Sequence, residues 1–139
     1  MKARLHPRTP TRGLLILLIT LLAGVGNAGA ATQVGETVLA RGLVSAGGPG
    51  ANARLIGSGA AVFQGDVITT GPRSSAILKL ADGSRIMIRP QSSFTVEEFS
   101  TDEAKPLAVM RLFKGGLRAV TGFISKRNPD AMRLRTAVA

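Results

Sequence analysis

Short runs of alternating apolar and polar residues follow one another along most of the chain after residue 30. Alternation with a period of two is typical of half-buried β-strands, because successive side chains on a strand point to opposite faces. The clearest runs, 76–80 and 85–89, are separated by Asp82-Gly83. That dipeptide predicts a β-hairpin with a type I′ turn, in which both central residues have positive φ. Pro90 should end the second strand because it has no N–H to donate.

The same reasoning predicts further short strands, separated by turns where glycine, proline, asparagine and aspartate gather. The expected strand regions are 34–44, 54–56, 62–63, 67–70, 94–97, 107–112, 117–121 and 132–136. Lys114-Gly115-Gly116 predicts a turn that joins 107–112 to 117–121 as a second hairpin. Gln64-Gly65-Asp66 and Asn128-Pro129-Asp130 predict tight turns.

Short strands at spacings of roughly 8–12 residues, with no capped helical period among them, predict an all-β domain. We expect a compact stack of short antiparallel strands and hairpins, arranged as a sandwich, a barrel or a β-solenoid-like stack. The large apolar side chains of the alternating runs should form its core. The residues expected there are Phe63, Leu78, Leu80, Ile86, Ile88, Phe94 and Leu112.

The first thirty residues follow another pattern, that of a helical secretory signal peptide. Four basic residues precede an uncharged apolar run over 14–23, and small residues follow it. Ala28-Gly29-Ala30 has the small-x-small spacing that signal peptidase accepts, so we expect cleavage after Ala30 or after Ala28. The run of ten residues is short against the roughly 20 that a membrane span needs, which favours a cleaved signal over an anchor.

Cleavage would leave residues 31–139 as a single β domain, periplasmic or secreted, with no membrane span. Four of the 18 basic residues lie in the signal, so this domain carries 14 basic and 8 acidic residues, a net charge of +6 in place of +10. The chain has no cysteine, which excludes disulfides and lipid attachment at a cysteine.

Few residues of this domain could perform chemistry. The single histidine, His6, lies in the signal, and Cys, Trp and Tyr are absent, so imidazole bases, thiol nucleophiles and soft metal ligands are missing. Glu97 and Glu98 are neighbours on a strand and should point to opposite faces. Asp66 and Asp82 stand beside glycines, where the side chain bonds the backbone two residues on. We therefore expect no catalytic residue, no cofactor, no metal and no enzyme activity.

Basic residues are scattered over separate strands and loops, apart from Lys126-Arg127 and Arg133 with Arg135. Single-strand nucleic-acid binders combine a basic groove with stacking aromatic side chains, whereas the five phenylalanines here stand at core-like positions. Nucleic acid is therefore not an expected partner. The scattered charge is interpreted as a solubility feature, and attraction to an anionic envelope polymer or membrane surface is the alternative.

Taken in order, several segments resemble the FecR domain family over most of residues 35–139. They are Gly57-Ser58-Gly59, 65–71, 75–84, 86–90, Ser93-Phe94, 109–118 and Arg135-Thr136. The resemblance implies a β-rich domain outside the cytoplasm. The family's namesake is a periplasmic sensor that relays a signal from an outer-membrane iron-siderophore transporter to an alternative sigma factor.

Two departures limit what the resemblance implies. Thirteen residues precede the apolar run, too few for the anti-sigma segment of the namesake, so sigma-factor control is not transferred to this chain. Family members continue after the Arg-Thr strand into a strand with Arg-Gly-Thr, whereas this chain stops at Ala139. We therefore expect a domain incomplete at its C-terminus that self-associates through an exposed strand edge.

These observations predict a non-catalytic interaction module of the cell envelope that binds a protein or a glycan through loops and strand edges. The alternative is a sensor component of transporter-linked, iron-siderophore-type signalling, whose transmembrane partner is encoded elsewhere.

Overall fold

A computed structural model of the chain describes residues 29–137, and a compact body begins at Ala31. Within the described range the regular structure is almost entirely β-strand, which confirms the all-β expectation. The strands are β1 Gln33–Arg41, β2 Val44–Gly47, β3 Arg54–Leu55, β4 Ala61–Phe63, β5 Val67–Thr70, β6 Ser75–Leu80, β7 Arg85–Ile88, β8 Ser93–Ser100, β9 Leu107–Lys114, β10 Leu117–Val120 and β11 Met132–Thr136. The apolar run at 14–23 and Ala28 lie outside the described residues.

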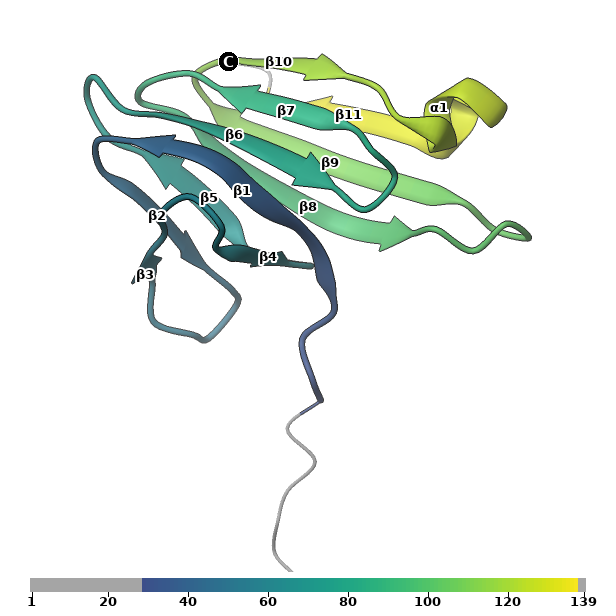
Figure 1. Ribbon diagram of the computed structural model, residues 1–139, viewed down its shortest axis with the longest axis horizontal. Coiled ribbons are helices and arrows are strands. Elements are labelled where there is room, and N and C mark those ends of the chain that lie inside the picture. Colours follow the sequence, from purple (N-terminus) through teal and green to yellow (C-terminus); the bar gives the residue numbers. More distant parts are fainter. Residues whose placement is uncertain (1–28, 138–139) are drawn as a thin grey trace, which may run out of the picture. The chain divides into compact units, whose positions relative to one another are not determined.

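Two sheets form a sandwich (Figure 1). One has five strands in the order β10-β7-β6-β1-β4, and the other has six in the order β11-β9-β8-β5-β2-β3. Neither sheet closes into a barrel. The strand pairs are antiparallel apart from β9 and β11, which run parallel. The parallel pair departs from the expected stack of antiparallel strands, because the chain crosses to the other sheet between β9 and β11.

The core lies between the sheets and takes side chains from both, including Phe94 and Ile68 from one and Ile86 and Ile88 from the other. Five of the seven residues expected there are fully buried: Leu78, Leu80, Ile86, Ile88 and Phe94. Leu112 is partly buried against this core. Phe63 is a wrong prediction, since Val62 is the buried residue of β4.

The expected strand over 34–44 divides in two at Gly42, where φ is +71°. Residues before it join the five-stranded sheet as β1, and residues after it join the other sheet as β2. A side chain at Gly42 would collide with Ser74, whose hydroxyl accepts a hydrogen bond from the Leu43 N–H at 2.9 Å. Glycine therefore allows the crossing between the sheets at this position.

The predicted second hairpin is wrong. β9 pairs with β8 and β11, while β10 pairs with β7 in the other sheet. The chain crosses at Gly115, where φ is +83° and where a Cβ would lie 2.7 Å from the Ser92 Cα atom. The Gly116 N–H donates to the Ser92 hydroxyl at 3.0 Å and fixes the crossing.

The first hairpin, β6–β7, is confirmed, but its turn type was predicted wrongly. Gly83 has a φ of +81° and Asp82 has no positive φ. The Gly83 N–H donates to the Leu80 carbonyl and the Leu80 N–H donates to the Ser84 carbonyl, each at 2.9 Å. This is a three-residue loop in which a type I turn is followed by a left-handed glycine. Asp82 accepts from the Ser84 N–H at 3.0 Å, so its expected bond two residues on is confirmed.

A short helix, α1 Phe123–Arg127, and a 3-10 turn, η1 Pro129–Ala131, were not predicted. Five residues are too few for an apolar period to stand out in the sequence. Ile124 of α1 is fully buried against Ala108 of β9 and Ala131 of η1, and this contact packs the helix against β9. No helix within 29–137 is long and apolar enough to cross a membrane.

Candidate binding face

The outer face of the five-stranded sheet carries most of the basic residues of its strands. In β7, exposed Arg85 and Met87 alternate with the buried residues Ile86 and Ile88. Register then places residues of neighbouring strands beside them on the same face. Met87 lies opposite Ile77 of β6 and Arg118 of β10, Ile77 lies opposite Leu39 of β1, and Arg85 lies opposite Lys79 and Val120.

Three rows therefore cross this sheet. The middle row is apolar and consists of Leu39, Ile77 and Met87, with Arg118 at its β10 end. Basic residues lie on either side of it. Arg85 and Lys79 belong to one flanking row, and Arg41 and Arg89 line the other side. We call this surface, made of Leu39, Arg41, Ile77, Lys79, Arg85, Met87, Arg89, Arg118 and Val120, the basic face.

A β-bulge in β1 turns Leu39 toward this face. Thr37 pairs with Leu78 and Leu39 pairs with Ile77, so Val38 is the extra residue between them. Strict alternation would send Leu39 inward with Thr37, which is fully buried. The bulge changes the phase of the strand and so completes the apolar row.

Two shallow hollows lie on the basic face on either side of the Ile77–Met87 pair. One, of about 380 Å³, is lined by Leu39, Arg41 and Arg89 together with that pair. The other, of about 250 Å³, is lined by Arg85, Arg118 and Val120 together with the same pair. Each hollow thus combines apolar surface with two arginines.

The cations of the basic face have no ion pair in the described part of the chain. Ion pairs there belong to Arg54, Arg111, Arg127 and Arg135. Glu36 is the acidic residue nearest in register, directly across from Lys79, and it lies beyond 4.0 Å. Five cations beside one carboxylate make this face strongly electropositive.

The outer face of the six-stranded sheet differs because two of its arginines, Arg111 and Arg135, share the carboxylate of Glu97. The Glu97 carboxylate of β8 lies 2.9 Å from the Nε atom of Arg111 of β9 and 3.9 Å from the Nη1 atom of Arg135 of β11. A bulge makes Glu97 the extra residue between the pairs formed by Val96 and Glu98. Glu97 and Glu98 consequently line the same outer groove, so the prediction that they face opposite ways is wrong.

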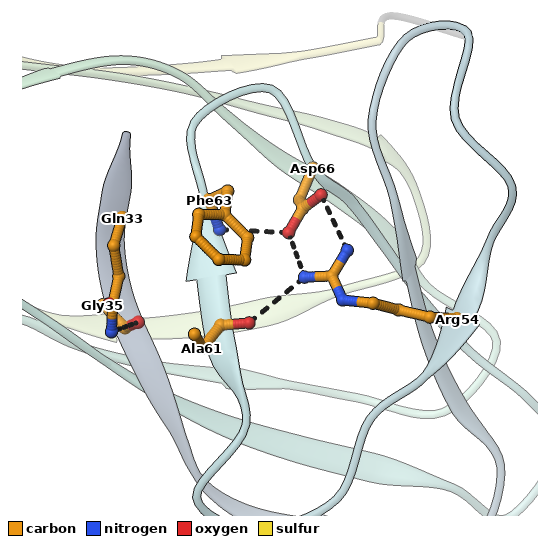
Figure 2. A network of polar contacts seen from close by, with 6 residues as sticks. All are labelled: Gln33, Gly35, Arg54, Ala61, Phe63 and Asp66. Carbon is orange, nitrogen blue, oxygen red and sulfur yellow. Dashed lines mark hydrogen bonds and ion pairs between the residues drawn. The ribbon is translucent and has the colours of Figure 1, made fainter. Parts of the chain in front are cut away.

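Asp66 has a structural role that the sequence did not reveal. Its carboxylate accepts from both terminal nitrogens of Arg54 and from the Phe63 N–H (Figure 2). Arg54 also donates to the Ala61 carbonyl at 3.1 Å, and its guanidinium carbon lies 5.3 Å from the centre of the Phe63 ring. The predicted bond to the backbone two residues on is absent for Asp66, since its oxygens are taken by residues that precede it.

Of the proposed cleavage residues, Ala30 lies in an exposed segment before β1, and Ala28 lies outside the described range. The residues described contain no group of three His, Cys, Asp or Glu side chains that could hold a metal ion. The sequence pattern does not predict the basic face, because its charges come from four strands that are far apart along the chain. One signal was present, namely the exposed positions of the alternating run 85–89, where Arg, Met and Arg follow one another at a spacing of two.

Comparison with known proteins gives one match. The family model described as FecR protein matches residues 66–139, which include β5 to β11 and thus three of the four strands of the basic face. No curated protein and no solved structure matches this chain.

Proposed function

The chain belongs to the FecR protein family, and from this premise we propose that residues 31–139 act as a non-catalytic binding module of the cell envelope. The partner would contact the basic face. One observation carries this proposal: five cations surround an apolar row and none of them has an ion pair among residues 29–137. Unpaired charge beside exposed apolar surface is typical of interaction sites.

Site-specific photo-crosslinking in cells tests the use of this face. A photoreactive residue replaces Met87, which is 45% exposed on the basic face, or Leu134, which is 43% exposed on β11 of the other sheet. We expect an adduct with a second protein from position 87, whereas position 134 should give at most a dimer of this chain through the β11 edge. Equal adducts from both positions, or none from either, would contradict the proposal.

The proposal includes export, with cleavage after Ala30 and release into the periplasm or the medium. Cleavage there is supported by the exposed position of Ala30. The chain makes a backbone hydrogen bond to the domain just after this point, where the Thr32 carbonyl accepts from the Gln64 N–H at 2.8 Å. A cut after Ala30 would leave this contact intact. Mass spectrometry of the exported protein should give a chain that begins at Ala31, and Ala28→Phe should block processing.

Association of two copies through a strand edge is part of the same proposal. Within the described residues β11 lies at the edge of the six-stranded sheet, with Leu134 exposed. Edge strands offer backbone groups for pairing. Light scattering on residues 31–139 should show dimers or larger species that Leu134→Lys reduces, whereas a monodisperse monomer would contradict this part.

A second candidate function follows from the family itself: a sensor component of transporter-linked, iron-siderophore-type signalling. Deletion of the gene should then abolish the induction of iron-uptake transcripts under iron limitation. Unchanged induction would favour the binding module without a signalling role.

A further inference from the structure

We propose that the basic face binds an acidic amphipathic segment of a partner protein, with carboxylates on its arginines and apolar side chains in its two hollows. This inference rests on the proposed function and deepens it by specifying the chemistry of the partner. The sites of contact are the Arg41–Arg89 hollow and the Arg85–Arg118 hollow, which share Ile77 and Met87.

Charge is the first reason. Four of the five cations on the face are arginines, and none of the five has a carboxylate within 4.0 Å in the described chain. A guanidinium presents a planar fork of donors that matches a carboxylate in a two-bond geometry. The opposite sheet shows the satisfied form of the same chemistry, since Glu97 there engages Arg111 at 2.9 Å. A partner with carboxylates would form the ion pairs that the described part of this chain does not provide to the basic face.

The apolar row is the second reason. Met87 and Val120 are 45% and 57% exposed, and they lie level with arginines instead of under a covering element. A purely acidic partner would leave this apolar surface in water, whereas a purely apolar partner would desolvate the guanidinium groups without pairing them. Both kinds of side chain are therefore needed on one segment.

The shape of the face favours a protein segment over a lipid surface. Proteins that lie on bilayers insert an apolar face several ångströms into the headgroup region. Here the apolar residues Leu39 and Ile77 are half-buried and lie within hollows between longer arginine side chains. Hollows of about 250 and 380 Å³ have room for the side chains of a partner protein, whereas a bilayer surface has no fixed side chains to fill them.

The test uses purified residues 31–139, the compact body, and a synthetic 18-residue helical peptide with leucine on one face and glutamate on the other. Isothermal titration and NMR shifts at Ile77, Met87 and Arg118 report binding. Matched peptides replace every glutamate by glutamine or every leucine by serine. We expect binding of the first peptide alone, with affinity that falls as salt is raised because exposed charges are screened.

Variants locate the contact. R85Q/R118Q and R41Q/R89Q should each weaken binding about tenfold, since each removes two charge pairs. K105Q/R133Q removes the same net charge far from the face and should leave affinity unchanged. The single variant R118Q should give a smaller loss of affinity. Because Arg118 is exposed on an edge strand, this substitution should leave the fold intact, and thermal melting checks the folding of each variant.

Three results would overturn the inference: equal binding of the glutamine peptide, equal loss in K105Q/R133Q, or binding of phosphatidylglycerol vesicles without binding of the acidic peptide. If position 87 forms a crosslink in cells but the acidic peptide does not bind, the proposed function stands and the acidic amphipathic partner is wrong. If neither occurs, both are wrong.

Discussion

Arg54 and Asp66 are joined by two hydrogen bonds, of 3.2 and 2.6 Å, but they differ sharply in burial. The side chain of Arg54 is 40% exposed and that of Asp66 is 5% exposed. The hydrogen bonds to Asp66, reinforced by its charge, raise the pKa of the Arg54 guanidinium above its ordinary value despite partial desolvation. A raised pKa means that this contribution to stability is present at neutral pH and is lost when the pH rises into strong alkali. The pair connects β3 to the β4–β5 turn under all ordinary conditions.

Removing either partner of this pair should destabilise the sandwich. Arg54→Gln leaves a buried carboxylate without its cation, and Asp66→Ala leaves the Phe63 N–H without its acceptor. We expect each to lower the free energy of unfolding by about 1–3 kcal/mol. Chemical denaturation of both single variants and the double variant should give a coupling of at least about 0.5 kcal/mol. The exposed pair Arg127–Glu103 is the control, and Arg127→Gln should cost less than about 0.5 kcal/mol. Additive single effects at Arg54 and Asp66 would refute the pairing.

Replacement of Thr37 by valine should stabilise the protein. Its side chain is fully buried on the core side of β1, and its hydroxyl has no hydrogen-bond partner within the described chain. Thr37→Val keeps the shape and removes the unpaired polar group, so we expect a gain of about 1 kcal/mol. Thr70 is the control because its equally buried hydroxyl donates to the Arg89 carbonyl at 2.7 Å and accepts from the Ser92 N–H at 3.0 Å. Thr70→Val should destabilise, and a loss of stability in both variants would contradict the reasoning.

Alanine substitutions at Gly115 and Gly83 should distinguish the stability cost of steric collision from that of backbone strain alone. Both have positive φ, +83° and +81°, but a Cβ at Gly115 meets the Ser92 backbone and a Cβ at Gly83 meets nothing within 4 Å. Gly83→Ala should therefore cost about 1 kcal/mol from backbone strain alone. Gly115→Ala should cost clearly more because the crossing to β10 must shift. Differential scanning calorimetry would measure both melting temperatures, and equal losses would disprove the close contact with Ser92.

Ser84 should be needed to hold the segment that enters α1. Its buried hydroxyl donates to the Asp82 carboxylate at 2.7 Å and accepts from the Gly122 N–H at 2.8 Å. Ser84→Ala leaves the Gly122 N–H unpaired and removes one of the two hydrogen bonds to the Asp82 carboxylate, and we expect a loss of about 1–3 kcal/mol. Hydrogen exchange should quicken at Gly122 and Phe123 first, because those amides are anchored by the β6–β7 loop. Unchanged exchange at these amides would count against this role.

Sequence patterns located most strands correctly because alternation and turn residues are local properties. The run 76–80, the loop at Asp82-Gly83 and the stop at Pro90 can be recognised within fifteen residues of chain. Partners of strands are not local. β9 and β10 look like a hairpin in the sequence, yet Gly115 sends them to different sheets. Phe63 was misplaced for a similar reason, since two adjacent apolar residues do not indicate which of them faces the core.

The sequence by itself determined an all-β domain, the glycines Gly42 and Gly115 at two of the crossings, and a set of side chains without cysteine, histidine, tryptophan or tyrosine after residue 30. These follow from composition and from the period of two that any strand obeys. Only the tertiary structure decided that Arg41, Lys79, Arg85, Arg89 and Arg118 share one face. Charges that are scattered along the chain become neighbours because antiparallel pairing brings residues that are distant in the sequence into register. Arg118 lies opposite Met87 and Met87 opposite Ile77, while Leu39 completes the row through its bulge. The physical reason is that the pairing register is set by burial of the opposite face, Ile86 and Ile88 against Leu78 and Ala76, and the basic face is its consequence.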